Sequence, residues 1–483
     1  MKPNVVFIVA DQLRYDFLHK GYTPNIDALL DSSTELERMY TASPLCVPAR
    51  GSLFTGTYPV TNNSLINPWT GPDVKYGYVK EDILDIYQIM ENAGYDCFHS
   101  GKQHLYKEGV MPQDRDGGTR FLSTEKTYGK FLKDNGFKRP GGERYRTICP
   151  KLIGNGKTIA KCYSNAKTGI YTGPDGAYFD QYFTSCLMEG LKERDKDKPL
   201  FISAMYLAPH PPLCIPEKYY DMYESVPISE NVCIWSEKQS PLQLYQITGA
   251  IGNGYEKKEW EETWRVYAGL CTLLDDQEKQ IIDYLKGNDL YDNSLIIFTT
   301  DHGEMLGSHS MFQKMCMYEE SSRTVFGIKM PYQKEGRKSD ALLSHVDVLP
   351  TILEALDIDV PLTVEGKSFL DIVQGNNRVE NEDVFIQFDG TDYLGNFART
   401  VVSGDYKLTM DIFKDEVFPE LYNVKSDPLE MNNLAFKDEY LELCNALLKK
   451  LIAHMKDKGD FICLDSFSFE EVKKQYREVF NYD

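Results

Sequence analysis

Four apolar, strand-like segments each end on polar residues, and this pattern restricts the fold more than any other feature of the sequence. The segments cover residues 5–10, 95–100, 200–208 and 295–300. The polar side chains at their ends are Asp11 and Gln12, Lys102 and His104, His210, and Asp301 and His302. Helical patterns lie between the segments, and strands that alternate with helices form a largely parallel sheet covered on both faces. Ligands of such sheets bind outside the carboxyl ends of the strands, so the pattern predicts one shared site.

Two of the intervening helices are well marked. Residues 82–93 and 260–286 have apolar side chains near helical spacing, and Gly94 and Gly287 follow them as stop signals. At 483 residues the chain exceeds the size of a single-core domain, so we expect a large domain and a smaller one.

The smaller domain is expected at the C-terminus. Three short strands are predicted at residues 398–403, 406–410 and 420–422, and a helix at 440–456. A small antiparallel sheet with one helix is the expected α+β arrangement. The tail is predicted to be helical from Ser468 and to cap either a cleft or a neighbouring subunit. The second alternative would make the protein a homo-oligomer. We predict a catalytic domain over residues 1–376 and a C-terminal subdomain with a helical tail over 377–483.

The net charge of −20 and the isoelectric point near 5 argue against partners that are polyanions, whether nucleic acid or an acidic membrane. Any anionic substrate must therefore meet a locally positive site. Segment 106–171 carries 14 Lys and Arg against 6 Asp and Glu, a net +8. It is either a solvated insertion or a positive surface that meets substrate, with Arg144 and Arg146 as candidates for the contact.

No apolar run reaches the length of a membrane-spanning helix. The N-terminal apolar run ends on Asp11, so we interpret it as a strand rather than a signal peptide. The eleven cysteines are scattered without CxxC pairs, which is typical of thiols in a reducing compartment. We therefore expect a cytoplasmic protein.

A reactive cysteine precedes a short helix in Cys46-Val47-Pro48-Ala49-Arg50, which runs on to Gly56. Proline suits the first helical turn and glycine the end of a helix. The unpaired N–H groups of the first turn make an anion site beside Cys46. Arg50, one turn further on, adds a planar cation that can hold a negatively charged oxygen.

This stretch resembles the signature of the type I sulfatases of the alkaline phosphatase superfamily, in which the cysteine is oxidised to formylglycine by a maturase. The resemblance extends over most of the chain. The matching motifs follow in the family's order: Asp11-Gln12, Gly101-Lys102-Gln103-His104, Pro209-His210-Pro211-Pro212, Asp301-His302-Gly303-Glu304 and Lys314. It implies an α/β fold, the alkaline-phosphatase-like α/β/α sandwich with a largely parallel central sheet, followed by the smaller C-terminal domain.

The resemblance also implies roles for single residues. The implied ligands of one divalent metal are Asp11, Gln12, the modified Cys46, Asp301 and His302. Arg50 and Lys102 are expected to stabilise the negative charge of a formylglycine hydrate, and His104 to act as the base. His210 and Lys314 match positions that hold sulfate oxygens, and one of them protonates the leaving alcohol. Asn67 matches a substrate-contacting position of choline sulfatases and phosphonate monoester hydrolases.

Two positions depart from the pattern of many arylsulfatases, which have Asp where Gln12 stands and Asn where His302 stands. Calcium is the expected metal. The lower negative charge at Gln12 and the softer imidazole of His302 leave manganese or magnesium open.

The leading hypothesis is a sulfatase acting on small sulfated sugars, glycan fragments or other imported sulfate esters. Gln12 and His302 also occur in phosphonate monoester and phosphodiester hydrolases that use the same formylglycine, which makes that activity the alternative. A third hypothesis is an inactive relative that binds sulfated glycans. The complete set of nucleophile, base and metal ligands argues against it.

Overall fold

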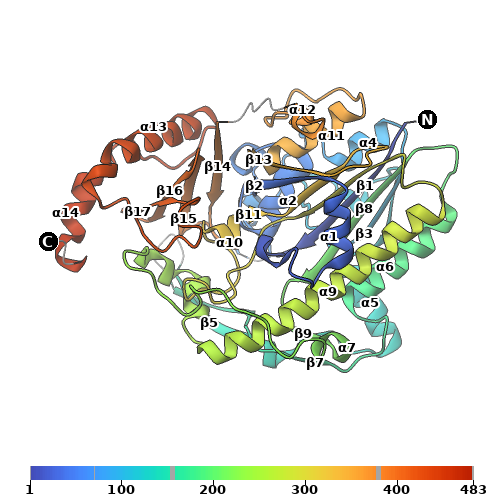
Figure 1. Cartoon of the computed structure of the whole chain (residues 1–483), viewed down its shortest axis with the longest axis horizontal. Helices are drawn as coiled ribbons and strands as arrows, with labels where there is room; N and C mark the ends of the chain where they lie inside the picture. Colours follow the sequence, from blue (N-terminus) through green and yellow to red (C-terminus); the bar gives the residue numbers. More distant parts are fainter. Residues whose placement is uncertain (1, 70, 153–157, 377–381, 481–483) are drawn as a thin grey trace.

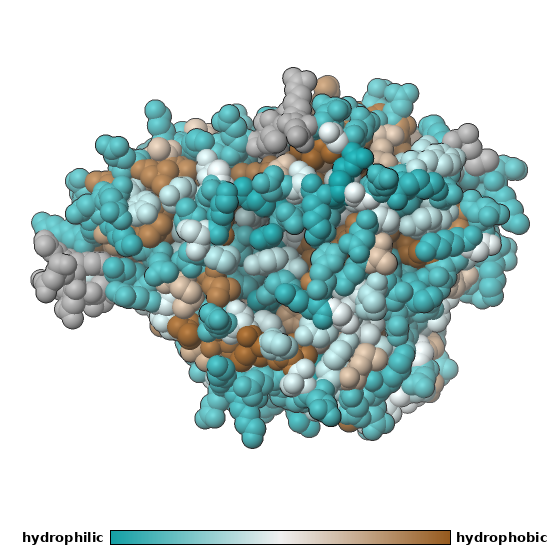
Figure 2. Space-filling model, in the orientation of Figure 1, coloured by the Kyte–Doolittle hydropathy of each residue, from teal (hydrophilic) through white to brown (hydrophobic). Residues whose placement is uncertain are grey.

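The computed structural model of the chain describes residues 2–69, 71–152, 158–376 and 382–480. It has a large α/β body and a smaller body built by the C-terminal part of the chain (Figure 1). The face drawn in Figure 2 is mostly hydrophilic, with an apolar band below its centre. Among the described residues no helix is both long and apolar enough to cross a membrane, and no described cysteine forms a disulfide.

A nine-stranded sheet forms the middle of the large body. Eight of its strands follow the spatial order β11 (Arg323–Thr324), β2 (Thr34–Tyr40), β12 (Phe326–Lys329), β10 (Ser294–Thr300), β1 (Asn4–Asp11), β8 (Leu200–Pro209), β3 (Asp96–Gly101) and β4 (Thr119–Ser123), and β13 (Arg337–Ser344) pairs with β2. The five strands from β10 to β4 are parallel to one another, while β12 runs antiparallel to β10. The prediction of a largely parallel sheet is confirmed.

Helices cover both faces of this sheet. Alternate residues of β1 point to opposite faces: Val6 and Ile8 belong to one apolar cluster, and Val5 and Phe7 to the other. The first cluster is completed by α1 (Pro24–Asp31), α6 (Phe179–Gly190) and α9 (Lys257–Gly287). The second is completed by α2 (Cys46–Thr55), α4 (Ile86–Asn92) and α11 (Val348–Ala355). The layers are therefore α/β/α, as predicted.

The helix expected from residue 82 begins later. Asp85 accepts the backbone N–H of Gln88 at 3.1 Å, and the Gln88 side chain accepts the backbone N–H of Asp85 at 3.2 Å. This capping box fixes the first residue of α4 at Ile86. The predicted 260–286 helix is confirmed as α9, which starts three residues earlier.

The basic segment 106–171 is more ordered than its composition suggested. It supplies the edge strand β4, helix α5 (Glu125–Asn135) and two strands that pair antiparallel, β5 (Arg146–Leu152) and β6 (Thr158–Ser164). Strand β7 (Gly169–Tyr171) then pairs with β9 (Cys214–Pro216). The remaining short helices are α3 (Pro59–Asn62), α7 (Glu217–Tyr220), α8 (Ile247–Gly252), α10 (Glu319–Ser322), α12 (Leu370–Val373) and the 3₁₀ turns Tyr15–Phe17, Val74–Gly77, Pro112–Asp114, Glu143–Tyr145, Leu191–Glu193, Pro241–Tyr245, His345–Asp347 and Asp438–Tyr440.

The smaller body is an antiparallel sheet with two helices. Its strands, in spatial order, are β14 (Asp383–Phe388), β15 (Phe397–Ser403), β16 (Tyr406–Phe413) and β17 (Glu416–Asn423). Three of these strands were predicted, and β14 was missed. Helix α13 (Leu441–Asp457) and the tail helix α14 (Phe469–Phe480) share an apolar core with the sheet. The tail therefore packs on its own domain. The predicted boundary at residue 376 borders positions 377–381, which lie outside the described residues, and it stays a prediction.

Candidate active site

The candidate residues meet at one edge of the central sheet. Strands β10, β1, β8 and β3 are neighbours in that order and run parallel, so their carboxyl ends lie together. Asp301, Asp11, His210 and Lys102 stand at or just after these ends in the same order. Gly101 has a φ of +109°, and an added Cβ there would lie 1.9 Å from the backbone of β8, so the turn into Lys102 requires glycine.

Cys46 is the first residue of α2 and lies at the floor of the site with 3% of its surface exposed. Its Sγ lies 3.2 Å from Nε2 of His302 and 3.8 Å from Oδ1 of Asp11. Burial acts to raise the pKa of the Cys46 thiol, but Lys314 and Lys102 hold it well below its ordinary value. These surroundings favour negative charge at position 46.

The guanidinium group of Arg50 lies between two buried carboxylates. Its Nε donates to Oδ2 of Asp301 at 2.9 Å, and its Nη2 donates to Oδ2 of Asp11 at 3.0 Å. Its Nη1 also donates to the carbonyl oxygen of Lys102. Because Arg50 stands one helical turn after Cys46, the helix fixes this cation close to the sulfur.

The two carboxylates have opposite pKa shifts. Burial acts to raise the pKa of Asp11, but Lys102 and His210 hold it well below its ordinary value. The Nζ atom of Lys102 lies 2.6 Å from Oδ2 of Asp11. Burial and the charge of Asp11 raise the pKa of Asp301. Two carboxylates this close to one another favour a bound cation.

Four residues of the site could hold that cation as a metal ion. Asp11, Cys46, Asp301 and His302 each offer one ligand atom, and these atoms all lie within 4.8 Å of one another. Nδ1 of His302 donates a hydrogen bond to the carbonyl oxygen of Gly303 at 3.0 Å. The lone pair of Nε2 therefore points toward the cluster. Carboxylate oxygens with an imidazole nitrogen suit a divalent metal, so these residues fit the metal that the resemblance implies.

Gln12, a predicted fifth ligand, has other contacts in this structure. Its backbone N–H donates to Oδ1 of Asp301 at 3.1 Å, and its carbonyl oxygen accepts the hydroxyl of Tyr267 at 2.6 Å. Its Oε1 accepts a hydrogen bond from Nζ of Lys314 at 2.6 Å, and its Nε2 has no hydrogen-bond partner within the described parts of the chain. Its role as a metal ligand stays a prediction.

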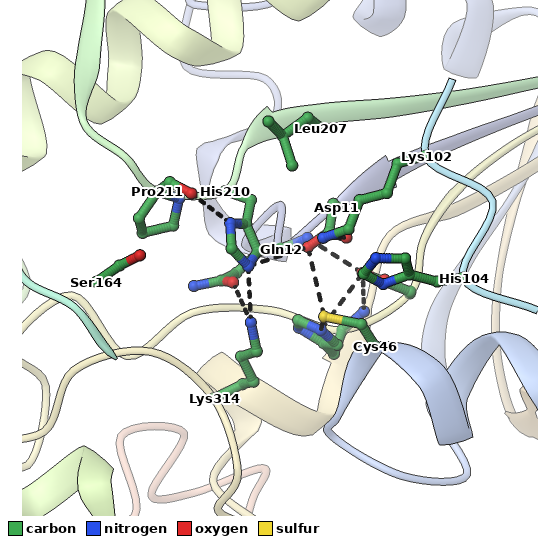
Figure 3. Close-up of polar contacts among 12 residues, drawn as sticks. Asp11, Gln12, Cys46, Lys102, His104, Ser164, Leu207, His210, Pro211 and Lys314 are labelled. Atoms are coloured by element: carbon green, nitrogen blue, oxygen red, sulfur yellow. Dashed lines mark hydrogen bonds and ion pairs between the residues drawn. The ribbon is translucent and has the colours of Figure 1, made fainter. Parts of the chain in front are cut away.

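His210 and Lys314 form a polar pair next to Cys46 (Figure 3). Nζ of Lys314 lies 3.1 Å from Nε2 of His210, and Nδ1 of His210 lies 2.5 Å from the carbonyl oxygen of Pro211. Nδ1 donates its hydrogen bond to this carbonyl, so Nε2 is unprotonated and accepts a hydrogen bond from the lysine ammonium. Burial, together with Lys102 and Lys314, lowers the pKa of His210 to about 4. The pair therefore combines a neutral imidazole with a cation.

Glu125 is a site residue that the sequence analysis missed. Its Oε2 lies 2.8 Å from Nε2 of His104. Burial acts to raise the pKa of Glu125, but His104 lowers it to about 2. Glu125 starts helix α5 after the capping residue Thr124. An acidic residue in a first helical turn is common for reasons of helix stability alone, so nothing local marked it as a partner of His104.

Two buried carboxylates shape the loops that carry His210 and Lys314. Asp180 accepts two backbone N–H groups near the end of β8, at 2.7 and 2.8 Å. Glu304 accepts the backbone N–H of Gln313, the neighbour of Lys314. Burial raises the pKa of each of these carboxyl groups to about 7. Glu304 belongs to a motif noted in the sequence, whereas no pattern marked Asp180.

An open cavity of about 1090 Å³ lies over this site. The predicted catalytic and substrate-binding residues that line it are Cys46, Asn67, Lys102, His104, His210 and Lys314. The Oδ1 atom of Asn67 accepts the backbone N–H of Val47 at 3.3 Å, so the amide also caps the first turn of α2. Asp11, Asp301, His302 and Arg50 are fully buried beneath the cavity floor.

Comparison with known proteins gives matches over nearly the whole chain. The sequence profile of the family described as Sulfatase matches residues 3–358, and that described as N-sulphoglucosamine sulphohydrolase, C-terminal, matches residues 307–457. An arylsulfatase from Clostridium perfringens is 26% identical over 95% of this chain and 96% of its own length.

Two solved structures have the same fold. A phosphonate monoester hydrolase from Silicibacter pomeroyi superposes with a TM-score of 0.74 at 21% identity, covering 97% of each chain. A protein solved in complex with its substrate, D-glucosamine-2-N,6-O-disulfate, superposes with a TM-score of 0.74 at 19% identity, covering 97% of this chain and 100% of its own.

Proposed function

This chain belongs to the sulfatase family of sulfuric ester hydrolases, and we propose that it releases sulfate from a small sulfated sugar or glycan fragment. The proposed nucleophile is formylglycine, made from Cys46 by a maturase, and the proposed cofactor is one divalent metal. The observation that carries the proposal is the buried group of Asp11, Cys46, Asp301 and His302, whose ligand atoms lie within 4.8 Å of one another at the carboxyl ends of the central strands. The sugar is proposed because a protein of the same fold binds a sulfated glucosamine.

The residues around position 46 suit an anionic nucleophile. When oxidised and hydrated, the residue at this position carries two hydroxyl groups. One attacks sulfur, and the other then forms the aldehyde again and so releases sulfate. His104, held by Glu125 at 2.8 Å, is proposed to accept a proton from this position. Arg50 and Lys102 are proposed to hold the negative charge that remains there.

The metal is proposed to be held by Asp11, Asp301, His302 and residue 46, with Gln12 as a further ligand. When bound, it would supply positive charge next to the nucleophile and the sulfate oxygens. Calcium is the proposed ion, and manganese or magnesium are the alternatives because His302 replaces a hard oxygen ligand.

Lys314 and His210 are proposed to hold sulfate oxygens. Because Nδ1 of His210 donates to Pro211, its Nε2 atom carries no proton and accepts from Lys314. The ammonium of Lys314 is therefore the group of this pair that can donate a proton to the departing alcohol. Asn67 is proposed to contact the substrate from the cavity wall.

The test combines peptide mass spectrometry with sulfate release from aryl and sugar sulfates. Active enzyme should contain formylglycine only at position 46, and material produced without a maturase should keep the thiol and release no sulfate. Cys46→Ala should abolish turnover, whereas the control Cys463→Ala changes an exposed cysteine and should retain it. Full turnover by protein with an unmodified Cys46 would refute the assignment.

A second candidate activity is hydrolysis of phosphonate monoesters or phosphodiesters by the same residues. The presence of Gln12 and His302 favours it, and a phosphonate monoester hydrolase shares the fold. Matched aryl sulfates and aryl phosphonates separate the two, since the preferred substrate has the higher kcat/KM. Binding of both without turnover by formylglycine-containing protein would instead indicate an inactive glycan-binding relative.

A further inference from the structure

The basic segment 106–171 builds part of the rim of the active-site cavity. The cations that it contributes to the lining are Lys126, Arg139, Arg146 and Lys161. Glu125 and Glu143 of the same segment also line the cavity. Arg144, the neighbouring cation that the sequence analysis paired with Arg146, is not among the lining residues. The segment thus presents charge to the same space as the proposed nucleophile.

Within the described residues three of these four cations, Lys126, Arg139 and Arg146, form no ion pair, although the charge of Arg139 acts on Glu125. Lys161 forms an ion pair with Asp392 at 2.5 Å. Arg139 lies 5.4 Å over the ring of Phe179, and Nη1 of Arg146 is bonded to a neutral hydroxyl group at 3.2 Å. Both side chains are exposed, so the guanidinium groups are free to meet an anion in the cavity.

The base of the rim is fixed relative to the sulfate-binding pair. Nδ2 of Asn165 donates to the carbonyl oxygens of Arg144 and Arg146 at 3.0 and 3.1 Å. Nε2 of Gln313 donates to the carbonyl oxygen of Ser164 at 3.0 Å, and Gln313 precedes Lys314. Figure 3 shows Ser164 on the same side of the site as His210. The rim is therefore preorganised, which lowers the entropy lost on binding.

An aromatic side chain lines the same cavity. Trp69 is 45% exposed, and its ring lies at 5.1 Å from that of His104 and 5.7 Å from that of Tyr106, both in edge-on arrangements. These contacts fix the indole next to the proposed base. An exposed, fixed aromatic surface suits the apolar side of a sugar ring.

We propose that this rim is a second subsite, which holds a neighbouring sugar residue that carries its own anionic group. Arg139 and Arg146 bind that anion, a carboxylate or a second sulfate, and Trp69 packs on the ring. The proposal rests on the proposed function, because it places the scissile sulfate at Cys46. The cavity of about 1090 Å³ has room for more than one sugar residue. In a chain of net charge −20, local cations are needed to hold a substrate with extra negative charge.

The experiment measures binding, so that it does not depend on turnover. Three disaccharides are titrated into the protein by calorimetry: glucose joined to N-acetylglucosamine, and two counterparts in which the glucose carries a 6-carboxylate or a 6-sulfate. We expect the anionic disaccharides to bind about fivefold more tightly than the neutral one, the effect of an exposed ion pair. The advantage should shrink as ionic strength rises. The rim prefers the anion whose advantage is lost when Arg139 or Arg146 is reversed in charge, since a sulfate can also bind at Cys46.

Matched variants locate the effect. Arg146→Glu and Arg139→Glu should each remove the advantage of the anionic ligands. Arg144→Glu makes the same charge change two residues away but outside the cavity lining, and it should retain the advantage. Trp69→Ala should lower the affinity for all three ligands by about tenfold, since it removes a ring contact and no charge.

Equal affinities for the three disaccharides, undetectable binding of all of them, or the same loss in Arg144→Glu as in Arg146→Glu would overturn the subsite. Sulfate release from 4-nitrophenyl sulfate and from sulfated sugars is followed in parallel and tests the proposed function alone. A protein that releases sulfate but does not distinguish the ligands lacks the subsite. A protein that distinguishes them but releases no sulfate refutes the proposed activity.

Discussion

Glu125 Oε2 lies 2.8 Å from Nε2 of His104, so a residue of the basic segment is in direct contact with the proposed catalytic base. The contact fixes the orientation of the imidazole. Glu125 is in this sense a positioning residue.

We predict that Glu125→Ala lowers kcat by about tenfold or more while KM changes little, because the imidazole loses its orienting partner. Glu125→Gln keeps a hydrogen-bond acceptor and should recover most of the turnover. Steady-state kinetics on an aryl sulfate and a thermal melt check this. Equal losses in the two variants, or a loss of kcat that follows a fall in melting temperature, would indicate a structural role only.

Asp301→Asn is predicted to lose bound metal and activity together. The carboxylate accepts a hydrogen bond from Arg50 at 2.9 Å and is one of the possible metal ligands. A neutral amide weakens its interaction with both the arginine and the metal. Elemental analysis after dialysis against chelator and restoration with calcium, manganese or magnesium measures the metal. Wild-type protein treated identically is the control. Wild-type metal content and turnover in the variant would show that the metal site is elsewhere.

Acid should destabilise the protein through His99. Its imidazole is fully buried, with Nδ1 at 3.0 Å from the hydroxyl of Tyr87 and 3.1 Å from that of Ser203, and burial lowers its pKa to about 3. The ordinary pKa is about 6.5, so between these values the unfolded chain binds the proton preferentially and stability falls as pH falls. The contribution of His99 is constant above about pH 6.5 and approaches about 1.4 kcal/mol per pH unit below it.

Urea unfolding of the wild type and of His99→Gln at several pH values between about 7 and 5 tests this expectation. The variant should show a shallower loss of stability with acid. Parallel curves for the wild type and His99→Gln would contradict the assignment.

A buried ion triad joins the two bodies of the protein. Nζ of Lys407 lies 2.9 Å from Glu319 and 2.7 Å from Glu430, and all three side chains are buried. Lys407→Met should lower the free energy of unfolding by about 3–5 kcal/mol, because it leaves two carboxylates without their cation. Lys425→Met breaks the exposed pair with Asp405 at 3.5 Å and should cost at most about 1 kcal/mol. Denaturant unfolding measures both, and similar losses in the two variants would contradict the prediction.

Part of the fold was predictable because its signals are local. An apolar run followed by Asp11 or Asp301 identifies a buried strand and its functional end without any knowledge of neighbours. The helix after Cys46 follows from proline, glycine and Arg50 in the same way. Strand β14 was missed, and it is specified by its pairing with β15 rather than by a local pattern.

The sequence by itself determined which residues stand at the strand ends and at the helix N-terminus, since these depend on periodicity and spacing along the chain. Only the tertiary structure decided which residues face one another. The contact of Glu125 with His104, the support of β8 by Asp180, and the exposure of Arg146 rather than Arg144 to the cavity all join distant segments or depend on the direction of one side chain. Such contacts come from packing and strand register, which no local pattern encodes.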